Sequence, residues 1–280
     1  MQKIELSAGM IEYEDTAGEG PVVVLLHGLA MDGSVWHQVV QQLRHDHRCL
    51  LPTLPLGSHR SPMRKDADLS SRGIAQLVAE LLQELDLREV TLVGNDSGIF
   101  QITAGLYPER IARLVITSCE SFENVPPGLP GRAAEIGVKM PGGAFLMAQA
   151  LRLHALRHLP LTFGWMAKRP IPHELVDAWL RPLQTRREIR RDLTRVMWAF
   201  RKEEMLTAAE RLRHFERPAL VVWALEDRIN PPTYGRRWAE LLPHGQLMEV
   251  ADSYALIPLD QPGALASAIR QFIQDTPCSP

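Results

Sequence analysis

The stretch Leu92-Val93-Gly94-Asn95-Asp96-Ser97-Gly98 decides the fold of this chain. An apolar run that is typical of a buried strand precedes it, and a segment with helical spacing of apolar residues follows it. Gly94 and Gly98 flank Asp96 in the order small-x-nucleophile-x-small. A sharp strand-to-helix turn requires neighbours without bulk, so the spacing predicts a nucleophile elbow that presents a carboxylate.

Ser97 fits this elbow less well than Asp96. If Ser97 were the nucleophile, its flanking residues would be Asn95 and Ile99, and isoleucine is too large for the turn. The alternative interpretation is an ordinary strand–turn–helix junction, in which the Asp96 side chain caps the N-terminus of the helix.

Strands and helices alternate on both sides of this stretch, which predicts an α/β fold with a doubly wound, mostly parallel sheet. The strand at 21–26 is continuously apolar, as expected of a strand buried on both faces. The other predicted strands lie at 11–14, 48–51, 90–93, 111–117, 218–223 and 246–250, and the helices at 34–45, 70–85, 97–107, 234–242 and 262–274.

The region 123–215 breaks the alternation, because it contains helical stretches at 144–156, 173–183 and 187–215 and no convincing strand. We interpret it as a helical cap inserted in a core domain that comprises residues 1–122 and 216–280. Such an insertion is expected over the C-terminal edge of the sheet, where ligands bind. Residues 150–217 hold 15 Lys or Arg against 8 Asp or Glu, which indicates either a solvated, salt-bridged helix face or attraction of anionic substrates.

Composition excludes several other classes of protein. With 280 residues, 45% hydrophobic and a net charge of −2, the chain is neither disordered nor suited to nucleic acid or anionic lipid. No apolar run approaches the ~20 residues of a membrane helix, and no signal peptide is recognisable. The scattered Cys49, Cys119 and Cys278 are expected to be free thiols. We therefore expect a cytoplasmic monomer or homodimer that binds a small-molecule substrate, and no cofactor or metal.

Four segments together resemble the α/β-hydrolase fold family: Leu26–Leu29, the elbow, the stretch 224–231 and the stretch 252–262. Within this family, an aspartate nucleophile resembles the branch of the haloalkane dehalogenases, fluoroacetate dehalogenases and epoxide hydrolases. The resemblance implies that the Asp96 carboxylate displaces a leaving group to form an aspartyl ester. A histidine, held by an acidic residue, then activates the water that hydrolyses the ester.

The resemblance also implies roles for other residues. The backbone N–H groups of Leu29 and Ser97 would form the anion-binding hole, while the His27 imidazole is expected to be structural. Asp227 matches the family's acid, although a loop aspartate that caps the next turn would look the same. Glu120 also follows a strand end, where some haloalkane dehalogenases place their acid.

The main departure from the family is Tyr254, which occupies the place of the catalytic histidine. A free tyrosine titrates at a pH of about 10 and a histidine at about 6.5, and a neighbouring Asp227 carboxylate would raise the tyrosine pKa further. Tyr254 would therefore be a hydrogen-bond donor and a poor base. Four other histidines could approach the sheet edge, and the sequence does not choose among them: His59, His154, His158 and His173.

Features of the subfamilies are mostly absent. Leu29 and Ser97 stand where haloalkane dehalogenases hold the halide with Asn and Trp, no tyrosine lies in 123–215, and the fluoroacetate dehalogenases' arginine after the nucleophile is missing. Large apolar residues of the cap, Trp165 among them, are expected to pack on the sheet and in part to line an apolar pocket.

Three hypotheses of function remain open. The first is a hydrolase of a small, largely apolar ester, halide or epoxide with Asp96 as nucleophile, Asp227 or Glu120 assisting, and a base other than residue 254. The second is a cofactor-free, non-hydrolytic enzyme in which Asp96 is a general base and Tyr254 donates to an oxyanion. The third is an inactive relative that binds a ligand without turnover.

Overall fold

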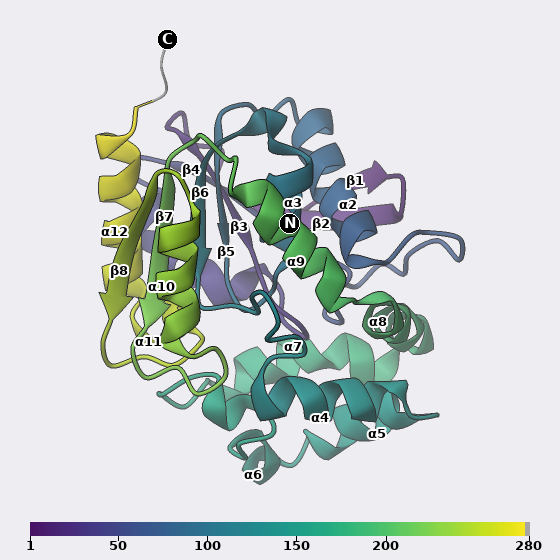
Figure 1. Cartoon of the computed structure of the whole chain (residues 1–280). Coiled ribbons are helices and arrows are strands. Elements are labelled where there is room, and N and C mark those ends of the chain that lie inside the picture. The colour runs from purple at the N-terminus through teal and green to yellow at the C-terminus, as the bar shows by residue number, and fades with distance from the viewer. Residues whose placement is uncertain (278–280) are drawn as a thin grey trace.

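The computed structural model describes residues 1–277 and contains one eight-stranded sheet in the order β1-β2-β4-β3-β5-β6-β7-β8 (Figure 1). The β1–β2 and β2–β4 pairs are antiparallel, and the other pairs are parallel. The predicted α/β fold class is therefore confirmed. The strands are β1 Gln2–Leu6, β2 Gly9–Asp15, β3 Val22–Leu26, β4 Arg48–Thr53, β5 Val90–Gly94, β6 Ile111–Thr117, β7 Ala219–Ala224 and β8 Gly245–Val250.

Helices cover both faces of the sheet, which explains the continuous apolar runs of its central strands. In β3, Val24 and Leu26 face one apolar cluster, whereas Val23 and Leu25 face the other. Helix α1 packs against α12 on one face, and α2 packs against α3 on the other. The helices are α1 His37–Leu43, α2 Ser71–Glu84, α3 Ile99–Leu106, α10 Pro232–Leu241, α11 Ile257–Asp260 and α12 Pro262–Asp275.

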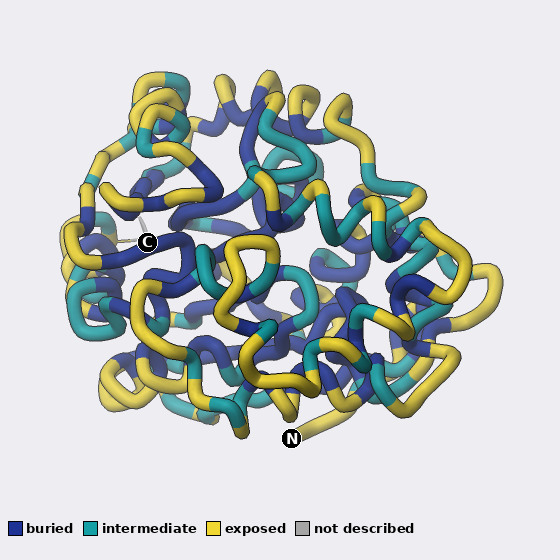
Figure 2. The backbone as a smooth tube through the Cα atoms, turned by 90° about the horizontal axis from the view of Figure 1, so that it is seen from below, coloured by how far each residue is buried: buried dark blue, intermediate teal, exposed yellow. Residues whose placement is uncertain are grey.

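Six α-helices lie between β6 and β7 in the described part of the chain. They are α4 Gly128–Lys139, α5 Gly143–Ala150, α6 His154–Arg157, α7 His173–Thr185, α8 Arg187–Ala199 and α9 Lys202–Leu212. Helices α4, α5, α7 and α8 contact one another, whereas α9 packs against α3 of the sheet layer. Figure 1 shows α4 to α8 gathered below the sheet. In the view from below, buried backbone runs through the interior and exposed backbone forms the outer turns (Figure 2).

The sequence-based helix boundaries are wrong at three places in this region. The predicted helix 187–215 is two helices, because Phe200 and Arg201 are extended at the junction of α8 and α9. The predicted helix 144–156 is divided into α5 and α6. Helix α4 was not predicted, because Pro127, Gly128, Pro130 and Gly131 in its first turns are typical of a loop.

Strand β1 was not predicted either, since it is a short edge strand that is held by its pairing with β2. Among residues 1–277, no helix has the length and hydropathy that crossing a bilayer requires. Cys49 and Cys119 are buried free thiols, as predicted, and Cys278 lies outside the described residues.

Candidate active site

The backbone at Asp96 has the geometry of a nucleophile elbow. Asp96 has a φ of 64°, in the left-handed region that few non-glycine residues adopt. Its N–H donates to the carbonyl of Ser118 (3.0 Å), and the N–H of Asn95 donates to the carbonyl of Leu26 (3.2 Å). The turn between β5 and α3 is thus held from both neighbouring strands. An aspartate held at positive φ, at a cost of about 1 kcal/mol, is typical of a functional site.

Two glycines let other segments approach the elbow closely. A methyl group at Gly98 would overlap the sulfur of Met205 in α9, and a methyl group at Gly28 would overlap Asp96 Oδ2. The loop after β3 therefore lies directly against the Asp96 carboxyl. These contacts give a physical reason for glycine at each position.

The Asn95 side chain holds the elbow in place through hydrogen bonds to two other segments. Its Nδ2 donates to Thr117 Oγ1 (2.8 Å), to the carbonyl of Ser118 (3.0 Å) and to the carbonyl of Ala255 (2.9 Å). One buried amide thus connects the elbow, the end of β6 and the loop after β8. We did not identify Asn95 from the sequence as more than a neighbour of Asp96.

Asp96 lines a cavity of about 430 Å³. Ser97, Leu29 and Glu120 line the same cavity, and most of its other lining is apolar and comes from α4, α5, α7 and α8. The apolar members include Val138, Ala144, Met147, Ala148, Leu180, Leu183, Leu193, Val196 and Met197. Such a cavity suits a small, largely apolar molecule with its reactive end at Asp96.

Three neighbouring carboxyl groups, of which Asp96 and Glu120 line the cavity, lie in an environment that disfavours negative charge. Burial, together with the negative charge of Asp227, raises the pKa of Asp96 from 3.8 to about 8. Burial raises the pKa of Asp227 to about 7, against the lowering effect of its hydrogen bonds. Burial and the charge of Asp96 raise the pKa of Glu120 well above its usual 4.5. Strong shifts of this kind cluster at catalytic sites.

Two of these carboxyl groups each have one buried oxygen without a hydrogen-bond partner among the described residues: Glu120 Oε2 and Asp227 Oδ2. Asp227 Oδ1 accepts from the N–H groups of Ile229 and Asn230, both at 2.8 Å. These bonds hold Asp227 in the loop after β7, as expected of an aspartate that caps the next turn, and they would equally leave its second oxygen to a further donor. Neither Leu29 nor Ser97 donates its backbone N–H to another described residue, so both N–H groups remain available to an anion.

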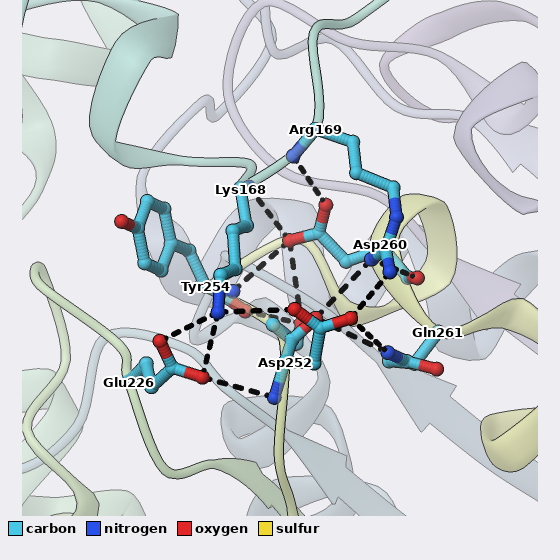
Figure 3. A network of polar contacts seen from close by, with 8 residues as sticks. Lys168, Arg169, Glu226, Asp252, Tyr254, Asp260 and Gln261 are labelled. Atoms are coloured by element: carbon cyan, nitrogen blue, oxygen red, sulfur yellow. Dashed lines mark hydrogen bonds and ion pairs between the residues drawn. The ribbon is translucent and has the colours of Figure 1, made fainter.

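The described contacts of Tyr254 are with Arg228 and Asp260 and not with the Asp96 carboxyl. It is absent from the described cavity lining, and the Arg228 guanidinium lies 4.4 Å from the centre of its ring. Its backbone N–H donates to Asp260 Oδ2 (3.0 Å), and Figure 3 shows its ring turned away from the charged groups around Asp252. Tyr254 thus belongs to the polar network that follows β8.

We call this network the clasp and define it as Glu226, Asp252 and Asp260 with Lys168 and Arg169 (Figure 3). Buried Asp260 accepts from the backbone N–H groups of Lys168 (2.8 Å) and Arg169 (2.9 Å). Lys168 Nζ lies 2.7 Å from Glu226 Oε2 and 3.0 Å from Asp252 Oδ1. Hydrogen bonds from Lys168 are the main cause that lowers the pKa of both Glu226 and Asp252. The clasp ties the segment before α7 to the loop after β8.

None of the ten histidines lines the cavity, all of them being among the described residues. His27 Nε2 accepts from the N–H of Leu54 (2.9 Å), so its Nδ1 carries the proton and donates to the carbonyl of Gly28 (2.8 Å). This pairing gives His27 a structural role in the loop after β3. His59 is buried, and its Nε2 lies 3.4 Å from Asp192 Oδ2.

The three remaining candidate histidines lie together in the inserted helices. His154 stacks on His173 with ring centres 3.9 Å apart, and His158 meets His173 edge-on at 5.9 Å. They contact one another instead of the Asp96 carboxyl. No histidine considered from the sequence therefore supplies the missing base.

The structure brings together Asp96, Glu120, Ser97 and Leu29, and places Asp227 close enough to influence Asp96. It does not bring His27, Tyr254 or Trp165 to the described lining of the cavity. Trp165 is partly buried in the short helix η3 (Phe163–Trp165), and it is Phe163 and Met166 on either side that line the cavity. The sequence predicts large apolar residues along the cavity, but which of the neighbouring residues face it depends on the helical turn at η3.

Comparison with known proteins now identifies the family. Residues 21–262 match the family model described as alpha/beta hydrolase fold. The chain belongs to the α/β-hydrolase fold family. The predicted family and the prediction of an enzyme of this family are thereby confirmed.

Three members of the family illustrate the range of similarity. A pimeloyl-[acyl-carrier protein] methyl ester esterase of Aeromonas salmonicida is 32% identical over 55% of this chain, a match that spans 64% of the esterase. A cis-3-alkyl-4-alkyloxetan-2-one decarboxylase of Shewanella oneidensis is 25% identical over 92% of this chain and 84% of its own. The haloalkane dehalogenase of Bradyrhizobium elkani has the same fold, with a TM-score of 0.77, 18% identity and coverage of 98% and 97% of the two chains.

Proposed function

We propose that this protein is a hydrolase that acts on a small, largely apolar molecule through a covalent ester on Asp96. The observation that carries the proposal is the Asp96 carboxyl, held at positive φ on the elbow and exposed to an apolar cavity. We further propose that α4 to α8 act as the cap that excludes water from this cavity.

The first half of the reaction follows from this geometry. The ionised Asp96 carboxylate attacks an electrophilic carbon of the substrate, and the bond from that carbon to the leaving group breaks. The N–H groups of Leu29 and Ser97 can bind the oxyanion that forms later, when water attacks the ester carbonyl. Because no histidine lines the cavity, another group must accept the proton from that water.

The competing hypotheses have less support. An enzyme with Asp96 as general base and Tyr254 as oxyanion donor requires the Tyr254 hydroxyl at the substrate, and Tyr254 is not in the described cavity lining. A ligand-binding protein without turnover does not explain why two buried carboxyl groups and the partly buried Glu120 are kept where ionising them is unfavourable.

The test is the intact mass of the protein after incubation with short alkyl halides, epoxides and activated esters, followed by peptide mapping. We expect an adduct on Asp96 and, after many turnovers in H₂¹⁸O, heavy oxygen in the Asp96 carboxyl. Asp96→Asn should form no adduct, whereas Asp66→Asn, in an exposed loop, should behave like the wild type.

Two outcomes would contradict the proposal. Turnover without an adduct and without heavy oxygen in the Asp96 peptide would favour the general-base enzyme. Saturable binding of a panel compound that Asp96→Asn leaves unchanged, with no turnover, would favour the binding protein.

A further inference from the structure

Exposed apolar side chains gather on the outer surface of the inserted helices. Thirteen large apolar side chains of the described residues are exposed, and eight of them lie within residues 129–161. Four of these eight are 60–65% exposed: Ile136, Met140, Leu146 and Leu153. Single exposed leucines are ordinary on a protein surface, whereas a cluster of them marks an interaction site. We call the exposed apolar side chains of residues 129–161 the apolar face.

The helices that carry this face are apolar on both sides. In α4, Val138 lines the cavity, while Ile136 and Met140 point to solvent. In α5, which has no charged residue, Ala148 lines the cavity and Leu146 is exposed. Figure 1 shows α4, α5 and α6 at the lower end of the molecule, below the sheet. A surface helix normally has a polar outer side, so packing within this chain does not account for the outer residues.

Basic residues accompany the apolar face. Residues 126–165 contain four Arg or Lys and a single carboxylate, Glu135, which pairs with Lys139 (Oε1 to Nζ, 2.6 Å). Arg132 and Arg152 are exposed, and neither side chain has an ion-pair or hydrogen-bond partner among residues 1–277. The net charge of the whole chain, −2, predicts no affinity for anionic lipid, but that average hides a local excess of positive charge.

Cations also lie over the aromatic rings at this end of the molecule. The fourth basic residue of the segment, Arg157, is buried in an internal ion pair. The Arg190 guanidinium lies 5.0 Å from the centre of the Phe145 ring, and Lys139 Nζ lies 5.1 Å from the centre of the Trp198 ring. Both rings are exposed. Long basic side chains beside exposed apolar groups are typical of a surface that lies at the boundary of lipid headgroups and acyl chains.

We propose that the apolar face docks on an anionic lipid surface, with Arg132 and Arg152 against the headgroups and the apolar side chains in the interfacial layer. Leu161 is half exposed in this face and also lines the cavity, so the cavity wall reaches the surface that lipid would cover. A lipid-soluble molecule can then enter the cavity without crossing water. This inference goes beyond the proposed function and does not depend on an ester on Asp96.

Other occupants suit the apolar face less well. A second copy of the chain would bring the unpaired Arg132 and Arg152 of both molecules into one symmetric interface, where few carboxylates are available to pair with them. A protein partner requires a surface of complementary shape, whereas side chains that are 60–65% exposed project from the helices. A lipid surface adapts to projecting apolar side chains and gains from the local positive charge.

The test is co-sedimentation of the full chain with two kinds of vesicle. One contains equal parts of phosphatidylglycerol and phosphatidylcholine, and the other contains phosphatidylcholine alone. The apolar variant is Ile136→Ser with Leu146→Ser, neither of which lines the cavity. Its matched control is Leu225→Ser with Leu247→Ser, two leucines outside the inserted helices that are 42% and 41% exposed.

A second pair of variants tests the charges. The charge variant is Arg132→Gln with Arg152→Gln. Its matched control is Arg44→Gln with Arg72→Gln, two exposed arginines that lie outside the inserted helices. Thermal melts verify that each variant is folded, and light scattering measures the oligomeric state of each protein.

We expect the wild type to bind the mixed vesicles and to bind phosphatidylcholine much more weakly. The apolar variant should bind the mixed vesicles at least about tenfold more weakly than the wild type, because less apolar surface enters the lipid. The charge variant should lose about fivefold in affinity for each arginine, and added salt should weaken binding by the wild type. Both controls should match the wild type.

Several outcomes would overturn this inference and leave the proposed function untouched. The first is a folded wild type that does not bind the mixed vesicles, and the second is a control that loses as much affinity as its variant. A wild-type dimer that the apolar variant separates into monomers would assign the face to a second copy of the chain. Binding that depends on the arginines but not on the apolar side chains would point to a soluble acidic partner.

Discussion

Carboxyl groups lie both beside the cavity and in the clasp, but their electrostatic environments are opposite. Asp96 and Glu120 line the cavity, Asp227 lies close enough to Asp96 to act on it, and the pKa values of all three are raised. In the clasp, Glu226 and Asp252 are paired with Lys168, and their pKa values are lowered. Both regions follow the C-terminal ends of strands in the same sheet. The difference shows that the environment decides whether a carboxylate supports structure or chemistry.

Desolvation and the distribution of cations explain the contrast. Glu226 and Asp252 of the clasp lie at the surface, where water and two basic side chains stabilise their negative charge. Asp96 and Asp227 are buried and Glu120 is partly buried, and Asp96 and Glu120 gain no compensating cation. A protein that keeps such groups together loses stability as the pH rises from about 4 to about 8, as expected where activity and stability compete.

The largest expected effect concerns Asp260, the buried carboxylate at the centre of the clasp. Asp260→Ala would leave the N–H groups of Lys168, Arg169 and Tyr254 without their acceptor. We expect it to lower the free energy of unfolding by about 3 kcal/mol in urea denaturation. Asp252→Ala, which removes exposed ion pairs and one exposed hydrogen bond from Gln261, should be much milder. Equal effects of the two variants would contradict the central place of Asp260.

The next largest effect concerns the pH dependence of stability, which should differ between the carboxyl groups beside the cavity and those of the clasp. The pKa of Asp96 is raised on folding from 3.8 to about 8, so its contribution to the free energy of unfolding falls as the pH rises across that window. Asp96→Asn should flatten this fall and raise the free energy of unfolding at about pH 8 by about 1–3 kcal/mol.

The pH dependence of stability expected from the clasp has the opposite sign. Because the pKa of Asp252 is lowered, its contribution is present above its usual pKa and is lost as the pH falls below it. Asp252→Asn should therefore leave the slope above about pH 5 unchanged. Urea titrations of both variants across the range measure these slopes. A parallel dependence in wild type and Asp96→Asn would show that Asp96 is not held in an unfavourable state.

A smaller effect is expected from the coupling of Asp227 to Asp96. Asp227→Asn keeps an oxygen that can accept from Ile229 and Asn230 but removes the negative charge that raises the pKa of Asp96. If ionised Asp96 is the nucleophile, the rising limb of the pH–rate profile should move to lower pH in this variant. Asp66→Asn serves as the control. A limb that stays in place would show that Asp227 acts on Asp96 in some other way.

The smallest effect is expected at Tyr254, which joins the clasp through its backbone and not through its hydroxyl. Tyr254→Phe should change kcat/KM by less than about threefold, because the ring packs beneath Arg228 outside the described cavity lining. A loss of a hundredfold would instead support the general-base hypothesis, in which this hydroxyl donates to an oxyanion.

Much of the fold and the elbow could be predicted from sequence, because local patterns encode them. Continuous apolar strands predict a sheet covered on both faces, and Gly94 and Gly98 predict the sharp turn at Asp96. The helix boundaries in 123–215 could not be predicted in the same way. Helix α4 begins in a segment rich in Pro and Gly, and α9 separates from α8 only by two extended residues.

The sequence by itself thus determined the α/β fold, the carboxylate at the elbow and the absence of histidine at residue 254, since each depends on residues adjacent in the chain. Only the tertiary structure decided that Glu120 shares a cavity with Asp96, that Asp227 adds its charge, and that Tyr254 is held in the clasp. The physical reason is that desolvation and Coulomb interactions depend on distances in space, between residues that lie far apart in sequence.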